Sequence, residues 1–345
     1  MQINVTDSEI DEQVHKLRAG DQRAIAKLMT YAEMNLFLAS QVIKKLYKYT
    51  GNAYIIGITG APGVGKSSLV NQMAAFYISE GHRVGIIAVD PTSPFSGGAI
   101  LGDRIRMKKS FSLKDVFIRS MANRGQMGGL ARATRDMIKI LDAAGYEIIL
   151  VETVGVGQDE IDIFKAAHTC VVIVVPGMGD EIQAIKAGIM EITDVFVVNK
   201  MDLSGVDRTI MDLETTLQLT HNSKPKKPIT PAQGLFVKVN NWKPPIIKTN
   251  AITGENIPKF IQNIQTHQDF LKKNDLLPIK KLAACKNEIM DIMKFQLYKK
   301  VEDYVFKNTD VNDLIEGIIE GDIDPYSISE DILAKFVKEA RILDK

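Results

Sequence analysis

Cysteine is scarce in this chain, and long apolar stretches are absent. Only two of the 345 residues, Cys170 and Cys285, are cysteines, and neither belongs to a Cys-x-x-Cys or Cys/His cluster. This spacing offers no zinc site and no disulfide framework, and it fits a reducing compartment. The longest apolar runs, such as 170–175, are far shorter than the roughly 20 residues that a membrane-spanning helix needs.

An excess of charge of either sign is also lacking. The chain has 43 Lys and Arg against 42 Asp and Glu, a formal net charge of +1. No strong field therefore draws it toward nucleic acid or an anionic membrane. Residues 1–9 have neither the apolar core of a signal peptide nor an Arg-rich amphipathic pattern, so we expect a cytoplasmic location. The 45% hydrophobic and 25% charged residues are typical of a globular protein with a sizeable core.

The most informative stretch is 60–67, Gly-Ala-Pro-Gly-Val-Gly-Lys-Ser, which matches the phosphate-loop pattern GxxxxGK[ST]. An apolar run at 54–59 predicts a buried strand before it, and helical spacing over 68–77 predicts a helix after it. A strand, a loop and a helix N-terminus in this order aim backbone N–H groups at a polyphosphate. A chance glycine-rich turn is the alternative, and the flanking elements argue against it. We expect phosphate contacts from Gly60, Gly63, Val64, Gly65, Lys66, Ser67 and Ser68.

Within this loop the side chains have separate expected roles. Lys66 would neutralise the β- and γ-phosphate oxygens, and the Ser67 hydroxyl would ligate Mg²⁺. The glycines let the backbone turn and approach the phosphates closely.

Carboxylates follow two predicted buried strands, at Asp90 and Glu152. Ligands of open α/β sheets bind at the carboxyl ends of the strands, so both are candidates for Mg²⁺. A turn or helix-cap role is the alternative for Asp90, and a structural role for Glu152. Gly155 would sense the γ-phosphate through its N–H group. Asp103 lies in a loop with two arginines that has the composition of a nucleotide-dependent switch.

A second motif, Asn199-Lys200-Met201-Asp202, follows a predicted strand at 195–198. The Asp202 carboxylate can accept hydrogen bonds from N1–H and the 2-amino group of guanine, a pair of donors that adenine lacks. The stem of Lys200 can cover the base. This NKxD motif therefore favours GTP over ATP. Asn250 and Ala251 stand where GTP-binding proteins place a backbone contact to guanine O6.

Alternating predicted strands and helices indicate an α/β fold with a mostly parallel sheet covered on both faces. We expect an N-terminal helical arm at 1–50, a P-loop GTPase domain at 51–270 and a C-terminal helical arm at 271–345. An apolar stripe at helical spacing over 279–306 predicts a long helix that needs a partner, so we expect a homodimer through this arm. Residues 220–248, rich in Lys and Pro, are expected to form an irregular insertion.

Several long segments are individually uncommon: GAPGVGKSS at 60–68, VDPTSPFSGGAILGDRIRM at 89–107, RSMANRGQMGGLARATRD at 119–136, VETVGVGQDE at 151–160 and VPGMGDEIQAIKAGIMEITDVFVVNKMD at 175–202. Together with DPYS at 324–327 they resemble the MeaB/ArgK family of P-loop GTPases, which includes methylmalonic aciduria type A proteins. The resemblance implies a SIMIBI-type GTPase sheet and the hydrolysis of GTP to GDP and phosphate. It also implies a chaperone that gates adenosylcobalamin loading and protects an acyl-CoA mutase of the methylmalonyl-CoA mutase type.

The resemblance also implies roles for individual residues. Asn199, Lys200 and Asp202 would read guanine, and the loop 177–186 would be a further switch that contacts the partner. The catalytic residues would be Lys66, Asp103 and Glu152, and those around Mg²⁺ would be Ser67, Asp90, Asp103 and Glu152. Val156 stands directly after Gly155, where Ras-like enzymes carry the glutamine that positions water, so we expect slow intrinsic hydrolysis that the partner accelerates.

Two other functions remain open at the level of sequence. A metal-insertion GTPase chaperone would share the sheet and the NKxD motif, but such proteins usually carry Cys/His metal motifs, which are not seen here. A transport-associated nucleotidase or kinase of basic amino acids is the other alternative, and the 199–202 motif argues against ATP as its nucleotide.

Overall fold

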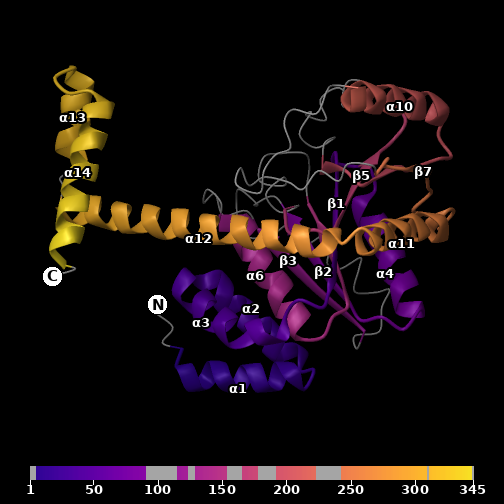
Figure 1. The fold of residues 1–345 in the computed structure, drawn as a ribbon, viewed down its shortest axis with the longest axis horizontal. Coiled ribbons are helices and arrows are strands. Elements are labelled where there is room, and N and C mark those ends of the chain that lie inside the picture. The colour runs from indigo at the N-terminus through magenta and orange to yellow at the C-terminus, as the bar shows by residue number, and fades with distance from the viewer. Residues whose placement is uncertain are drawn as a thin grey trace. The chain divides into compact units, whose positions relative to one another are not determined.

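The computed structural model describes residues 5–90, 115–122, 129–153, 165–177, 192–222, 242–308 and 311–343 (Figure 1). The chain divides into two compact units, Met1–Asn287 and Glu288–Lys345. The helices are α1 (Asp7–Arg18), α2 (Gln22–Met34), α3 (Leu36–Leu46), η1 (Tyr47–Tyr49), α4 (Lys66–Ser79), α6 (Gly129–Ala143), α10 (Val206–Asn222), α11 (Ile257–Lys273), α12 (Leu276–Asn308), α13 (Val311–Glu320) and α14 (Pro325–Leu343). The strands are β1 (Tyr54–Gly60), β2 (Val84–Asp90), β3 (Val116–Ala122), β4 (Ile148–Glu152), β5 (Thr169–Val174), β6 (Val195–Val198) and β7 (Ile246–Lys248).

The seven strands form one sheet in the order β3-β2-β4-β1-β5-β6-β7, and each pair of neighbours is parallel. Strands β4, β5 and β6 are buried along their whole length, as expected for apolar strands with helices on both faces. Because all strands run the same way, the carboxyl ends of β1, β4 and β6 meet at one edge. The predicted parallel α/β sheet is confirmed.

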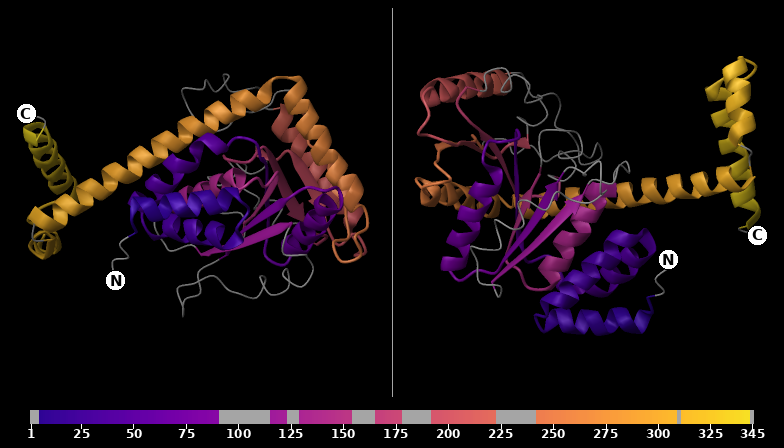
Figure 2. Two further views of the ribbon diagram at one scale, coloured as in Figure 1. Left: turned by 90° about the horizontal axis from the view of Figure 1, so that it is seen from below. Right: turned by 180° about the vertical axis from the view of Figure 1, so that it is seen from behind.

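Alternate residues of each strand enter different cores. In β4, Ile149 and Val151 pack with α1–α3 and α6, whereas Ile148 and Leu150 pack with α4 and α11. The two sets of helices lie on opposite faces of the sheet (Figure 2). Helix α10 covers β5 and β6 through a smaller core that includes Phe196. Helices thus cover both faces of the sheet, and the ends of the strands remain available for ligands.

The N-terminal helices begin at side-chain caps. Asp21, the cap of α2, accepts hydrogen bonds from the backbone N–H groups of Arg23 (2.7 Å) and Ala24 (3.3 Å). The connection from these helices into β1 is fastened by Asp142 of α6. Its carboxylate accepts the successive backbone N–H groups of residues 51–53, at 2.5, 3.1 and 3.0 Å. A buried carboxylate in a nest of backbone donors fixes where β1 starts.

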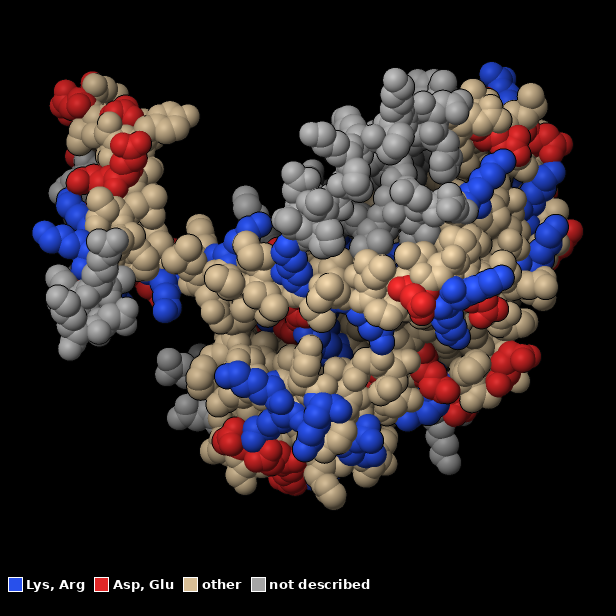
Figure 3. Space-filling model, viewed as in Figure 1, with Lys and Arg blue, Asp and Glu red and all other residues tan. Residues whose placement is uncertain are grey.

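Basic and acidic side chains are interspersed over the face of Met1–Asn287 seen in Figure 3. Ion pairs such as Lys45 with Asp11 (2.6 Å) and Lys27 with Glu9 (2.9 Å) link the N-terminal helices at the surface. This interspersion agrees with the near-zero net charge of the sequence.

Helix α12 confirms the long helix predicted over 279–306, and the boundary between the two units falls within it. Within Glu288–Lys345, the rings of Tyr304 and Phe336 contact each other edge to face, with centroids 5.5 Å apart. Many apolar side chains of this unit are exposed, among them Leu297 (57%) and Ile319 (78%). No helix in the described part of the chain is both long and apolar enough to cross a membrane.

Candidate functional site

The loop between β1 and α4 has the backbone that its glycines predict. Gly63 and Gly65 have φ values of 80° and 93°, which L side chains rarely adopt. A Cβ atom on Gly60 would lie 2.3 Å from the carbonyl oxygen of Ile173, and one on Gly65 would lie 2.5 Å from Asn199 Nδ2. Glycine is therefore required at 60 and 65 by close packing as well as by backbone angle.

Lys66 begins α4 and turns back over the loop. Its Nζ donates to the carbonyl oxygens of Gly60 (2.8 Å) and Ala61 (2.9 Å), and the residue is 8% exposed. The ammonium group is thus held at the mouth of the loop by carbonyl oxygens. A phosphate at this helix N-terminus would meet both this charge and the backbone N–H groups.

Ser67 and Glu152 come together although they lie far apart in the sequence. Ser67 Oγ donates to Glu152 Oε1 at 2.7 Å, because β1 and β4 are adjacent and Ile58 pairs with Glu152. Glu152 is 7% exposed. Two oxygen ligands on one side of the phosphate loop suit Mg²⁺, which prefers carboxylate and hydroxyl oxygens and retains waters. The residues present therefore fit this ion.

The structure describes the other predicted site residues only in part or not at all. Asp90 ends β2 at the same edge of the sheet, and only its backbone is described. Ser68 lies exposed in the first turn of α4. Asp103, Gly155 and the residues after Gly177 in the predicted 177–186 switch lie outside the described residues, as do 223–241 of the predicted insertion.

Asn199 connects the phosphate loop with the loop that follows β7, at Thr249 and Ala251. Its Nδ2 donates to the carbonyl oxygen of Val64 (2.8 Å), and its Oδ1 accepts Thr249 Oγ1 (3.2 Å) and the backbone N–H of Ala251 (3.0 Å). Asn199 is 2% exposed, so these contacts replace all contact with water. The predicted contact of Ala251 with guanine O6 stays a prediction, because this N–H group bonds Asn199 here.

Asp202, in the loop after β6, and Asn250, in the loop after β7, face each other. Asn250 Nδ2 donates to Asp202 Oδ1 at 2.8 Å. Lys200 has a φ of 57°, an uncommon value that turns the chain between Asn199 and Asp202.

Two side-chain contacts of this site were missed from the sequence. One is the Asn250 side chain, whose preference for turns after strands was a usable signal. The other is Gln72 of α4, whose Nε2 donates to the Ala251 carbonyl oxygen at 3.1 Å. Nothing in the helical pattern of α4 distinguishes Gln72 from a surface residue.

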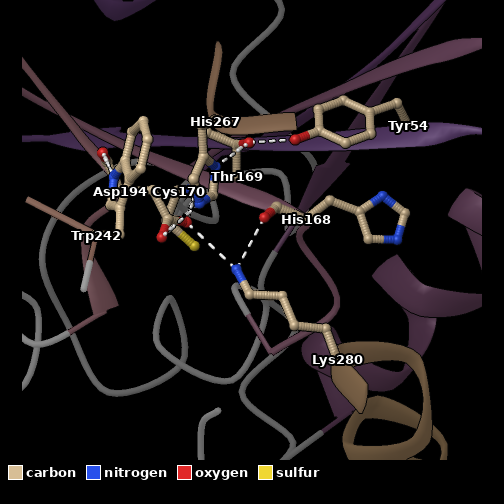
Figure 4. A network of polar contacts seen from close by, with 8 residues as sticks. All are labelled: Tyr54, His168, Thr169, Cys170, Asp194, Trp242, His267 and Lys280. Carbon is tan, nitrogen blue, oxygen red and sulfur yellow. Dashed lines mark hydrogen bonds and ion pairs between the residues drawn. The ribbon is translucent and has the colours of Figure 1, made fainter. Parts of the chain in front are cut away.

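A second polar network lies at the amino ends of the strands, away from the phosphate loop (Figure 4). Tyr54 OH and Thr169 Oγ1 lie 2.5 Å apart, Thr169 Oγ1 is 2.8 Å from His267 Nδ1, and His267 Nε2 is 3.3 Å from Asp194 Oδ1. The order hydroxyl, imidazole and carboxylate is that of hydrolase triads. Thr169 and His267, however, are each 0% exposed, so no substrate reaches them.

The network instead fastens the start of α12. Lys280 Nζ donates to the His168 carbonyl oxygen (2.9 Å) and lies 3.5 Å from Asp194 Oδ2. Burial lowers the pKa of His267 to about 4, with the Lys280 charge acting in the same direction and the Asp194 charge opposing it. His267 is thus neutral at pH 7, and the network is structural.

Sequence comparisons with known proteins indicate one family. The sequence model of the family "Methylmalonyl Co-A mutase-associated GTPase MeaB" matches residues 25–305. A Pyrococcus horikoshii protein named as a GTPase is 46% identical over 328 residues, which cover 95% of this chain and 98% of that protein. The methylmalonic aciduria type A homolog of Caenorhabditis elegans is 26% identical over 322 residues, covering 87% of this chain and 77% of its own.

Among solved structures, a protein described as an LAO/AO transport system kinase has a TM-score of 0.68. It is 22% identical, and the match covers 97% of this chain and 100% of that one, which supports the fold. The family match over most of the chain goes further than the fold. The chain belongs to the MeaB family and is a GTPase, a hydrolase that acts on GTP.

Proposed function

We propose that GTP binds along the carboxyl edge of β1, β4 and β6, with its phosphates in the 60–68 loop and its base at Asn199, Lys200 and Asp202. The observation that carries this proposal is the Asn199 side chain, which bonds Val64 of the phosphate loop and Ala251 of the opposite loop. One buried amide thus sets the spacing between the two halves of the site. Asp202 then accepts the N1–H and 2-amino donors of guanine.

In this proposal Ser67 and Glu152 would hold Mg²⁺, together with Asp90 and Asp103. The ion, when bound, supplies positive charge to the phosphate oxygens. Lys66 exchanges its two carbonyl partners for phosphate oxygens and stabilises the charge that develops during hydrolysis. Gly155 senses the γ-phosphate. With Val156 in place of a water-positioning glutamine, the intrinsic rate is slow and a partner accelerates it.

The partner we propose is an adenosylcobalamin-dependent acyl-CoA mutase of the methylmalonyl-CoA mutase type. The description of the matching family and the name of the Caenorhabditis elegans relative support this choice. The chain would act as a chaperone that gates cofactor loading and protects the mutase, in the cytoplasm. The 177–186 loop would contact the mutase.

We also propose that the chain consists of a helical arm at 1–50, a GTPase domain at 51–270 and a helical arm at 271–345. The last arm would form a homodimer. Exposed apolar side chains on α12 support it, including Leu282 (67%), Met293 (58%) and Leu297 (57%). Exposed apolar side chains that form a continuous patch typically mark a surface that binds a partner. A monomeric mass by light scattering across the micromolar range would contradict this part of the proposal.

The decisive experiment measures GTP hydrolysis with and without an adenosylcobalamin-dependent mutase from the same source. We expect the mutase to accelerate GTP hydrolysis, and Glu152→Gln to remove most of the accelerated rate. ATP in place of GTP is the matched control and should be hydrolysed far more slowly. If no such mutase forms a complex or changes the rate, the chaperone role is wrong, while GTP hydrolysis by the chain alone would still stand.

A further inference from the structure

Asn250 follows β7 closely and is 9% exposed. Its Oδ1 accepts two hydrogen bonds, from the backbone N–H groups of Ile252 (3.0 Å) and Thr253 (3.2 Å). Its Nδ2 donates to Asp202 Oδ1 at 2.8 Å. Both ends of this amide are thus committed to the two loops around the expected base.

The chemistry of these partners fixes the orientation of the amide. If the group were flipped, the NH₂ would face two N–H donors and the oxygen would face a carboxylate oxygen, which is repulsive on both sides. The donor end therefore points at Asp202. The two loop N–H groups hold the Oδ1 atom of this amide in place. The backbone of the loop therefore sets the direction in which Nδ2 donates to Asp202.

Asp202 depends on such a contact. It lies exposed in the turn that follows β6, where a short side chain in water can rotate among several orientations. Recognition of guanine needs the carboxylate plane to match two donors at once. A group already held in the binding orientation loses less freedom when the base arrives.

We infer that Asn250 is a positioning residue for base selectivity, which orients the Asp202 carboxylate toward N1–H and the 2-amino group of guanine. This inference rests on the proposed guanine-binding role of Asp202. Asn250 touches the carboxylate and acts on the base through it. Its specific consequence is discrimination between guanine and hypoxanthine, because these bases differ only by the 2-amino group that the oriented carboxylate reads.

The chain offers a well-matched set of variants. Asn250→Asp keeps an acceptor for the two loop N–H groups, replaces the donor to Asp202 with a carboxylate oxygen and sets a like charge against Asp202. Asn250→Ala removes both. Gln72→Ala is the control, since it deletes another side-chain hydrogen bond to the same loop, at the Ala251 carbonyl oxygen, without touching Asp202.

The test is the ratio of the dissociation constants for IDP and GDP, measured on the full chain by competition with a fluorescent guanine nucleotide. We expect Asn250→Asp and Asn250→Ala each to lower the preference for GDP by about tenfold, the size expected for a hydrogen bond to a charged group. Gln72→Ala should weaken both nucleotides by the same factor and leave the ratio unchanged. Thermal melts confirm that each variant is folded.

Failure of the inference and failure of the proposed site give different results. If Asn250→Asp keeps the wild-type ratio while Asp202→Asn loses it, the carboxylate reads guanine without help from Asn250, and the inference is overturned. A loss of ratio in Gln72→Ala as large as in Asn250→Ala would also overturn it. If Asp202→Asn itself keeps the ratio, the proposed role of Asp202 is wrong.

Discussion

Substitution of Asp194 by asparagine is the sharpest stability test of the buried network in Figure 4. The side chains of Asp194 and Lys280 are 11% and 15% exposed, so both charges are largely removed from water. Asp194 Oδ2 accepts the backbone N–H of Cys170 (2.9 Å), and Oδ1 faces His267 Nε2 (3.3 Å). An amide supplies only one acceptor oxygen, so its NH₂ group would face either His267 Nε2 or both the Cys170 N–H group and the Lys280 ammonium group.

The expected cost follows from these contacts. Removal of one partner of a buried ion pair costs about 3–5 kcal/mol, because the other charge is left uncompensated. Lys280 keeps its 2.9 Å bond to the His168 carbonyl oxygen and some solvent contact, so the lower end applies. We expect Asp194→Asn to lower the free energy of unfolding by about 3 kcal/mol.

Urea unfolding at pH 7 measures this cost, and a double-mutant cycle tests its cause. Lys280→Met removes the stranded charge, so the pair of substitutions should cost at least about 1 kcal/mol less than the sum of the single ones. Additive costs would refute the ion-pair explanation. A cost below about 1 kcal/mol for Asp194→Asn alone would show that the network does not hold α12 in place.

Three further predictions each concern one residue: Asp142, His267 and Gly65. Asp142→Ala leaves three successive backbone N–H groups without their acceptor and should lower the free energy of unfolding by about 3 kcal/mol in urea melts; a cost below about 1 kcal/mol would contradict this reading. The pKa of His267 in the folded chain, about 4, lies below its ordinary 6.5, so the unfolded chain takes up the proton first. Stability should therefore fall as pH drops from about 6.5 to 4, by up to about 3 kcal/mol from this residue, and His267→Gln should flatten that slope in unfolding titrations. Gly65→Ala places a methyl group 2.5 Å from Asn199 Nδ2 and should weaken GDP binding at least about tenfold. Gly63→Ala should weaken it less, because among the described residues only its chain neighbours come within 4 Å of the added carbon. Equal losses in equilibrium binding would refute the steric argument.

Much of the fold was predictable because the relevant signals are local. The apolar runs at β1, β4, β5 and β6 are bounded by glycines and carboxylates, and their alternation with helical patterns implies a parallel sheet. The cap at Asp21 is a local feature of the same kind, since it bonds N–H groups two and three residues along the chain. The domain boundaries predicted at 50 and 270 stay predictions.

The individual residues of the site were predictable from the sequence, but their arrangement in space was not. The sequence identified three separate motifs, each after an expected strand: Lys66 and Ser67 in the phosphate loop, Glu152, and Asn199 with Asp202. Strand order was not available from the sequence, because parallel strands that are distant along the chain pair through their crossovers. The approach of Ser67 to Glu152 depends on β4 lying beside β1, and that of Asn199 to Val64 depends on the packing of β5 and β6.

By itself, the sequence determined the phosphate loop, the guanine motif and the helix caps, because these depend on backbone conformations and hydrogen bonds within a few residues. Tertiary structure alone decided which distant groups share a site. It set the amide of Asn250 against Asp202, and it buried His267 beside Asp194 as a neutral support. The physical reason is that side-chain orientation, burial and pKa are set by neighbours that the fold brings together, and residue types in order along the chain do not contain those neighbours.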